Sequence, residues 1–255
     1  MYSKLMYLKI KNSAKQIIPK RILYKYELVF RWFWYLFYKG NRYQCPICQK
    51  SLRNFIPIEN DKLCPYCGSL SRNRRLWTVL TNNILNEGMT VLDFSPSRCL
   101  FRAMKEIPNI HYTSTDFSGD FIADKKYDIT KIDVQDTFYD LIVCYHILEH
   151  IEDDKQAIKE LYRVLKPDGV CVVQTPFKKG EIYENSAITS EVDRQNHFGQ
   201  KDHVRLYSVD GLYKRLNALG FEVEVKEYVE NVSNRFGFAE HETILVCRKK
   251  STDQF

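Results

Sequence analysis

Four of the eight cysteines form two C-P-x-C pairs that are separated by fifteen residues. Two residues between the thiols of each pair allow a tight turn that points both sulfur atoms to one side, and Gly68 can take the left-handed conformation that such a turn needs. Four thiolates complete the tetrahedral coordination of Zn²⁺ and leave no position open for a substrate. The spacing therefore predicts a structural zinc site, in place of disulfides, formed by Cys45, Cys48, Cys64 and Cys67.

Polar residues also gather where the predicted strands end, and ligands of open α/β sheets bind beyond the carboxyl ends of the strands. Asp116 ends the second strand, nineteen residues after Ser97. At that separation a carboxylate can accept hydrogen bonds from both hydroxyls of a ribose. In the alternative interpretation, Asp116 only caps the next turn. The other candidates at strand ends are Asp93, Ser95, Ser97, Asp128, Cys144, His146, Glu149 and His150.

The elements that must position these residues alternate between helical and strand periodicity from residue 69 onward. They predict a Rossmann-like, doubly wound α/β sheet, mostly parallel, with an antiparallel edge strand. The stretch 177–208 has no clear periodicity, which is typical of a functional lid, and its candidate contacts are His197, Asp202, His203 and Arg205. The predicted helices are 71–86, 97–106, 153–165 and 209–219, and the predicted strands are 90–94, 110–115, 139–144, 169–175, 221–228 and 242–249.

The N-terminal arm is basic and aromatic. Residues 1–42 carry ten Lys or Arg and one Glu, a charge of +9 that leaves −3 for the remainder of a chain with a net charge of +6. The stretch 21–39 predicts an amphipathic helix with a wide apolar face, which would lie in a membrane interface or pack on the protein's own core. The charged side of this helix carries Arg21, Lys25, Glu27, Arg31 and Lys39.

Composition and length limit the class of protein. A hydrophobic content of 44% with 27% charged residues excludes disordered and fibrous proteins. We predict a helical arm at 1–43, a zinc ribbon at 44–70 and an α/β domain at 71–255 with the lid-like insertion at 177–208. Lysines interrupt every early apolar run before it could serve as a signal peptide, so we expect a cytoplasmic protein, with a possible peripheral contact at the inner face of the membrane.

The order of these motifs resembles the class I S-adenosylmethionine-dependent methyltransferases. VLDFSPS at 91–97 precedes YTSTD at 112–116 and YDIT at 127–130. The densest match, from Tyr139 to Pro176, is similar to the small-molecule type, with a strand, HILEHI, a helix and LKPDG before the next strand. The ribbon joined to CGSLSRNRRLW is similar to a bacterial subgroup with an N-terminal zinc ribbon. The resemblance covers about residues 71–250 and implies S-adenosylmethionine as cofactor, beside structural Zn²⁺.

The resemblance also implies which residues contact the cofactor. S-adenosylmethionine has no phosphate, so the strictest reason for glycine in the first loop is absent and serines suffice there. A positive φ at Ser95 would indicate strain with a functional reason. Cys144 would otherwise be a buried, inert thiol. The implied contacts are Asp93 at the methionine end, Ser95 and Ser97 in the first loop, Asp116 at the ribose, Asp128 and the Ile129 N–H at the adenine, and Cys144 at the strand end.

The run from His146 to His150, HILEH, has two interpretations. In a methyltransferase, His146 faces the transferring methyl group and is, with His203, a candidate general base for a hydroxyl acceptor, while Glu149 and His150 order the turn. The same run matches the H-x-x-E-H motif of inverted zinc proteases. That metal site would need a third ligand from elsewhere and a helix that starts before His146, whereas 141–144 predicts a strand.

The favoured hypothesis is an in-line transfer of the sulfonium methyl group to an oxygen or nitrogen of a small molecule, glycan or lipid-linked acceptor. One alternative is an RNA methyltransferase that grips nucleic acid with the ribbon and the basic arm. Another is a non-catalytic zinc-ribbon binding module on a methyltransferase fold that has lost its cofactor. Arg72, Arg74 and Arg75 indicate either an anionic partner or a solvated surface cluster.

Overall fold

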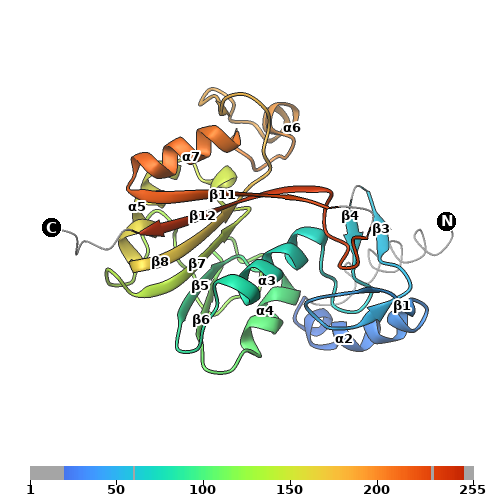
Figure 1. Ribbon diagram of the computed structural model, residues 1–255. Helices are drawn as coiled ribbons and strands as arrows, with labels where there is room; N and C mark the ends of the chain where they lie inside the picture. The colour runs from blue at the N-terminus through green and yellow to red at the C-terminus, as the bar shows by residue number, and fades with distance from the viewer. Residues whose placement is uncertain (1–19, 60, 231–232, 250–255) are drawn as a thin grey trace. The chain divides into compact units, whose positions relative to one another are not determined.

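The computed structural model describes residues 20–59, 61–230 and 233–249 (Figure 1). These residues form two compact units, each with its own core. The first unit contains the described residues up to Asn83, with Ser97–Ala103 and Val229–Glu242. The second unit contains Ile84–Pro96, Met104–Tyr228 and the described residues from Thr243 onward.

A six-stranded sheet with the order β11-β12-β8-β7-β5-β6 forms the framework of the second unit (Figure 1). The strands β5, β6, β7 and β8 are parallel, and β12 pairs antiparallel with β8. The predicted α/β sheet, mostly parallel with an antiparallel edge, is therefore confirmed. The strands are β5 (Thr90–Phe94), β6 (His111–Thr115), β7 (Tyr139–Tyr145), β8 (Leu165–Gln174), β11 (Phe221–Val229) and β12 (His241–Lys249).

Two amphipathic helices pack their apolar sides on this sheet. In α5 (Asp154–Val164) the inward residues recur at helical spacing, and the helix starts at Asp153, whose side chain accepts a hydrogen bond from the Gln156 N–H at 3.0 Å. In α7 (Val209–Ala218) the Ser208 hydroxyl has the same capping role. The shared core includes Leu92, Ile142, Cys144, Ala157, Leu161, Val173, Leu212, Leu216 and Leu245. The strands that carry the candidate site are thereby held rigidly at their buried middles.

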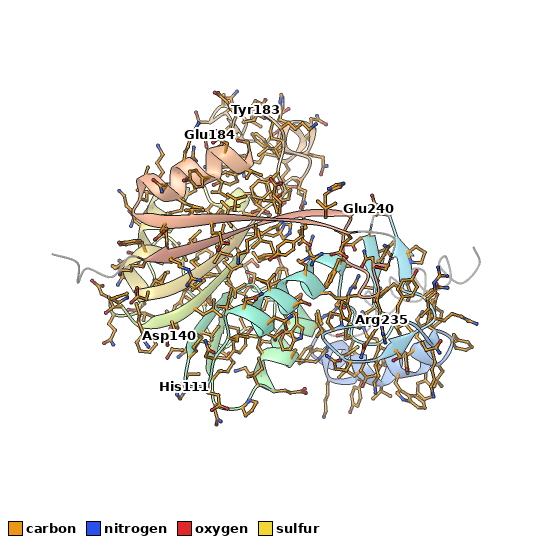
Figure 2. The ribbon with its side chains drawn as sticks, in the orientation of Figure 1. His111, Asp140, Tyr183, Glu184, Arg235 and Glu240 are labelled. Atoms are coloured by element: carbon orange, nitrogen blue, oxygen red, sulfur yellow. The ribbon has the colours of Figure 1, made fainter. Side chains whose placement is uncertain are left out.

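The predicted lid-like insertion, residues 177–208 and called the lid below, contains regular structure that the sequence did not predict. It forms β9 (Tyr183–Glu184), α6 (Glu191–Phe198) and β10 (Arg205–Leu206), and Figure 2 labels the two residues of β9. Ser190 caps α6 at its start, and Gly199 ends it in the left-handed region at φ 82°. Most of α6 is exposed, so its sequence lacks the apolar periodicity by which a helix is recognised.

The first unit surrounds the cysteine pairs with short strands and helices. The strand β1 (Lys39–Gln44) pairs antiparallel with β2 (Ser51–Leu52), and β3 (Ile56–Ile58) pairs antiparallel with β4 (Asp61–Leu63). These hairpins place one C-P-x-C pair after β1 and the other after β4. The helices are α2 (Lys20–Leu36), α3 (Ser71–Asn83) and α4 (Arg98–Lys105), of which α4 continues into the second unit.

The helix α2 turns most of its apolar side chains outward, while Trp34 and Tyr35 pack inside the first unit. It ends at Leu36, so Lys39 of the predicted helix begins β1. Glu27 and Arg31 face the first unit and form an ion pair at 2.8 Å, and Glu27 also accepts from Arg102 at 2.7 Å. The structure therefore turns two residues of the predicted charged side inward, whereas Lys25 of the same side is exposed. The exposed apolar side chains are Tyr26, Val29, Phe30, Trp32, Phe33, Leu36 and Phe37.

Candidate functional site

The four predicted zinc ligands converge in the first unit. The sulfur atoms of Cys45 and Cys67 lie 3.6 Å apart, and those of Cys48 and Cys64 lie 3.8 Å apart. A tetrahedral zinc with Zn–S bonds of about 2.3 Å requires sulfur atoms about 3.8 Å apart, so the donor set fits this ion. Gly68 adopts φ 78° as predicted, where its N–H donates to the Cys64 carbonyl at 3.0 Å. All eight cysteines are recorded as free thiols in the structure.

A buried arginine connects this cluster to the rest of the first unit. The Arg74 side chain is 0% exposed, and its guanidinium stacks on the Phe55 ring at 4.2 Å. Arg75 is buried as well and pairs with Glu230, whereas Arg72 is exposed. Two arginines of the predicted surface cluster are therefore structural. Arg74 donates to the backbone carbonyls of Lys62, Ser69, Phe236 and Gly237.

The parallel pairing of β5 and β6 brings two cofactor candidates of the second unit together. Ser95 follows β5, and its N–H donates to the Thr115 carbonyl at 2.7 Å. Its hydroxyl donates to Asp116 Oδ1, also at 2.7 Å. Ser95 adopts φ 47°, the strained conformation that we associated with function. The glycine-free loop therefore makes a turn that usually favours glycine.

The carboxylate of Asp116 is 6% exposed and accepts hydrogen bonds from its own turn. The Gly119 N–H donates to Oδ2 at 2.6 Å, and the Ser118 hydroxyl lies 3.1 Å from the same atom. With Ser95, two hydroxyl groups therefore already donate to this carboxylate. The observed contacts are those of the interpretation in which Asp116 caps its turn, and the contact with a ribose stays a prediction.

Asp93 lies at the end of β5 and is 3% exposed. Burial raises the pKa of Asp93 to about 7, although the Tyr112 hydroxyl donates to Oδ2 at 3.0 Å and opposes the shift. Tyr112 was not among the predicted site residues. The signal in the sequence was the alternation of side chains along a strand, which puts Tyr112 and Ser114 on the same face of β6. Ser114 is the residue of β6 that pairs with Asp93.

The remaining cofactor candidates differ in accessibility. Asp128 is exposed, and its carboxylate accepts from the N–H and hydroxyl of Thr130 at 2.8 and 2.7 Å. Ile129 and Cys144 lie in the core, and burial raises the pKa of the Cys144 thiol well above its ordinary value. In the first unit, the Ser97 hydroxyl lies 3.2 Å from the Cys99 sulfur, and the Ser97 carbonyl accepts the first hydrogen bond of α4 from Phe101 at 2.9 Å.

The two predicted bases, His146 and His203, both lie near Glu149. His146 follows β7 at φ 59°, and its Nδ1 lies 3.3 Å from Glu149 Oε1. Burial would raise the pKa of Glu149, but the hydrogen bond and charge of His146 hold it below its ordinary value. Burial and the neighbouring His150 lower the pKa of His203. One donor atom each from Glu149, His150 and His203 lies within 4.8 Å of the others.

Two further polar side chains at the carboxyl end of β8 were missed. Gln174 Oε1 and Thr175 Oγ1 are buried and have no hydrogen-bond partner among the described residues. The sequence signal was the QTP that follows an uninterrupted apolar strand.

An open, mostly parallel sheet with its polar candidates at the carboxyl ends of β5, β6 and β7 defines a Rossmann-like binding fold. A family model described as "Methyltransferase domain" matches residues 70–225. The chain belongs to this family, the class I S-adenosylmethionine-dependent methyltransferases.

Individual relatives match only part of the chain. A ubiquinone biosynthesis O-methyltransferase from Rickettsia typhi is 26% identical over 104 residues, which are 38% of this chain and 41% of that protein. An uncharacterized methyltransferase from Oceanobacillus iheyensis is 33% identical over 110 residues, 42% of this chain and 46% of the relative. The chain thus spans less than half the length of these relatives.

The fold is also similar to that of a solved structure, the Haemonchus contortus phosphoethanolamine N-methyltransferase 2 in complex with S-adenosyl-L-methionine. The TM-score is 0.51 at 14% identity, and the match covers 70% of this chain and 53% of the other.

Proposed function

We propose that this protein transfers a methyl group from S-adenosylmethionine to an oxygen or nitrogen of a small-molecule, glycan or lipid-linked acceptor. The observation that carries the proposal is the junction of Ser95 and Asp116 at the carboxyl ends of adjacent parallel strands, in a chain of this family. The relatives include a protein named for O-methylation and a fold neighbour named for N-methylation, which supports a small acceptor and leaves the acceptor atom open.

The cofactor supplies an activated methyl group, and the residues of this chain bind and orient it. Asp116 would accept the ribose hydroxyls in place of the Ser95 and Ser118 hydroxyls that it now binds. Asp93 would contact the methionine end, and Asp128 with the Ile129 N–H would hold the adenine. Ser95 would position the first loop, Ser97 would anchor α4 through its carbonyl, and Cys144, which is buried in the core, would support the floor of the site.

A hydroxyl acceptor must lose a proton during methylation, and two histidines are candidates for removing it. His146 follows β7 directly, while His203 comes from the lid. The pKa of His203 is lowered, which keeps its imidazole neutral and able to accept a proton at neutral pH. We propose His146 as the base because Glu149 can stabilise the imidazolium that forms.

The ribbon of residues 44–70 is proposed to hold one structural Zn²⁺ through its four cysteines, and to form its own module between the arm 1–43 and the catalytic domain 71–255. The support is the sulfur spacing and the buried environment of three of the four thiols. Because all four positions around the ion are occupied by protein, this zinc would not take part in methyl transfer.

The exposed side of α2 is proposed to contact a membrane surface, which would favour a lipid-linked acceptor. No helix among the described residues is long and apolar enough to cross a bilayer. The side chains of Phe30 and Phe33 are 61% and 57% exposed, beside basic residues such as Lys25 and Lys39. An aromatic face bordered by positive charge fits an interface with anionic lipids.

Calorimetric titration of the full chain with S-adenosylhomocysteine tests cofactor binding first. We expect micromolar binding, followed by transfer of labelled methyl groups to an acceptor in lipid or small-molecule extracts. Binding without transfer to any extract would leave RNA as the acceptor to test, and absence of cofactor binding would refute the proposed function.

Vesicle sedimentation tests the membrane contact. Replacing Phe30 and Phe33 together by Glu should lower binding to vesicles with anionic lipid at least tenfold, because each buried aromatic contributes about 2 kcal/mol. Val192→Glu is the matched control, since Val192 is an exposed apolar residue of α6. Equal binding of both variants would contradict the assignment.

A further inference from the structure

The strongest cluster outside the cofactor edge and the cysteine ribbon consists of Glu149, His150 and His203. One donor atom of each residue lies within 4.8 Å of the other two. The first two residues come from the short helix η1 (Leu148–His150) that follows β7, and the third comes from the lid, more than fifty residues later. The metal interpretation of HILEH needed a ligand from elsewhere in the chain, and His203 is in the position to be that ligand. The cluster uses Glu149 and His150 of HILEH, and His146 is not part of it.

Two buried polar atoms of this cluster lack a hydrogen-bond partner among the described residues. Glu149 is 1% exposed, and its Oε2 has no hydrogen-bond partner among the described residues. His203 is 2% exposed, and its Nδ1 is equally without a partner in the described part of the chain. A buried carboxylate oxygen and a buried ring nitrogen both lose hydration when no protein group replaces water, and the loss is larger for the charged carboxylate. A cation between them would satisfy both.

Hydrogen bonds connect the segment that carries His203 to the helix η1 that carries Glu149 and His150. The Val204 N–H donates to the Glu149 carbonyl at 2.9 Å. Arg205, 5% exposed, donates to the Leu148 carbonyl at 3.1 Å and binds the Glu152 carbonyl at 2.7 Å. His203 therefore stands on a segment that is tied to both sides of η1, which is the rigid support that a metal ligand needs.

His150 has the outer contacts of a metal-bound histidine. Its Nδ1 lies 3.3 Å from both the backbone carbonyl and the carboxylate of Asp202. Metal-ligating histidines usually donate their second ring N–H to such an oxygen, which orients the ring and leaves the other nitrogen for the ion. The rings of His150 and His203 stand at 84° with centroids 4.7 Å apart, an edge-to-face arrangement and not a stack that would close the space between them.

We infer that Glu149, His150 and His203 form a site for a divalent transition-metal ion such as Zn²⁺ or Co²⁺. Two imidazoles and one carboxylate suit these ions and leave at least one coordination position open. The side chain of His150 is 31% exposed, so the ion and a ligand can enter from solvent. His146 stays outside the ligand set, in contact with Glu149.

The position of the site gives it a role that rests on the proposed methyl transfer. Glu149 and His150 follow the carboxyl end of β7, where the acceptor would lie. An ion with an open position would bind an acceptor oxygen and lower the pKa of its hydroxyl. The acceptor class is then a hydroxyl compound, and His146 would receive the proton.

Metal binding is tested on the full chain after its ribbon has been loaded with one Zn²⁺. Dialysis against micromolar Zn²⁺ and elemental analysis should give two ions per chain. Co²⁺ added to the loaded protein should produce a visible absorption band without the thiolate charge-transfer band that cobalt in the ribbon would show. Soft thiolates retain zinc, so Co²⁺ reports the second site.

Glu149→Gln and His150→Asn should each return the content to one ion and weaken Co²⁺ binding at least tenfold. Glu149→Gln preserves side-chain volume. Because His150 is partly exposed, we expect His150→Asn to retain the fold, and circular dichroism checks this. The control is His111→Ala, because His111 is exposed at the amino end of β6, the opposite end of the strands (Figure 2). Here we expect two ions.

One ion in the parent chain, or two ions in both variants, would overturn the site. Titration with S-adenosylhomocysteine separates this failure from failure of the proposed function, because cofactor binding does not require the ion. If the second ion binds and the cofactor does not, the metal site stands and the methyltransferase proposal falls.

Discussion

Replacing Arg74 by Met tests how the ribbon is held. The substitution keeps a long apolar side chain against Phe55 but removes the donors that Arg74 directs at the four carbonyls described above. The Ser69 carbonyl retains a second hydrogen bond, from the Cys64 N–H at 2.8 Å, so the loss falls mainly on the other three carbonyls. A buried carbonyl without a partner costs about 1–3 kcal/mol.

Water that enters the vacated volume would reduce this sum, and removing one member of a buried charged network typically costs about 3–5 kcal/mol. We therefore expect the free energy of unfolding of the first unit to fall by about 3–5 kcal/mol in Arg74→Met. The positive charge of Arg74 also faces the ribbon thiolates, since Cys45, Cys64 and Cys67 raise the pKa of Arg74 against the larger, lowering effect of burial. Zinc should consequently leave the variant faster when a chelator is added.

Tryptophan fluorescence during guanidinium denaturation is a selective assay, because the three tryptophans, Trp32, Trp34 and Trp77, all belong to the first unit. Arg72→Met removes the same charge from an exposed position of α3 and should change stability by less than about 0.5 kcal/mol. If the two variants agreed within about 1 kcal/mol, comparable to ordinary substitution effects, the carbonyl contacts would not be what holds the ribbon.

Three further predictions concern the cofactor edge and the ribbon. Asp116→Ala should weaken binding of S-adenosylhomocysteine by about 1.5–3 kcal/mol, roughly ten- to a hundredfold, and unchanged calorimetric affinity would remove Asp116 from the site. Cys45→Ser should lower the zinc content of the ribbon and unfold it, as seen by elemental analysis and fluorescence. Because Asp93 has a folded pKa of about 7 against an ordinary 3.8, its protonated form stabilises the fold at low pH, and that contribution disappears as pH rises from about 4 to 7. Asp93→Asn should abolish this slope, at most about 1.4 kcal/mol per pH unit, in denaturation series.

The sheet was predictable because its strands are long apolar runs separated by helices of clear periodicity. The predicted strand 90–94 and the observed β5 coincide, and helix 153–165 differs from α5 by one residue at each end. The helix 71–86 ends three residues early, at Asn83, because the residues after it form a turn. The lid helix α6 was missed because a mostly exposed helix is specified by its Ser190 and Gly199 caps, which also occur in loops.

The candidate site was predictable only where strand order places residues side by side. Asp93 and Asp116 could be located because the ends of neighbouring parallel strands meet at one edge. The hydrogen bonds of the Asp116 carboxylate and the pKa of Asp93 could not be predicted in the same way. The hydrogen bonds from Ser118 and Gly119 to Asp116 come from a local turn, and the pKa of Asp93 depends on how completely it is buried. His203 reaches Glu149 through the folding of the lid, which no local pattern in the sequence encodes.

The helix α2 shows why amphipathicity alone does not identify the buried face. The periodicity separated apolar from charged residues but did not identify the buried side, because Lys25 of the charged side is exposed and Tyr35 is buried. Charges are ordinarily assigned to solvent because burying an unpaired charge is costly. Here Glu27 faces Arg31 and Arg102 at hydrogen-bonding distance, and these cations hold the pKa of Glu27 below its ordinary value despite burial. With Glu27 and Arg31 paired inside the first unit, most of the aromatic side chains of α2 point outward. Within the described part of the chain this apolar face is exposed, and a contiguous exposed apolar face favours a surface that it contacts.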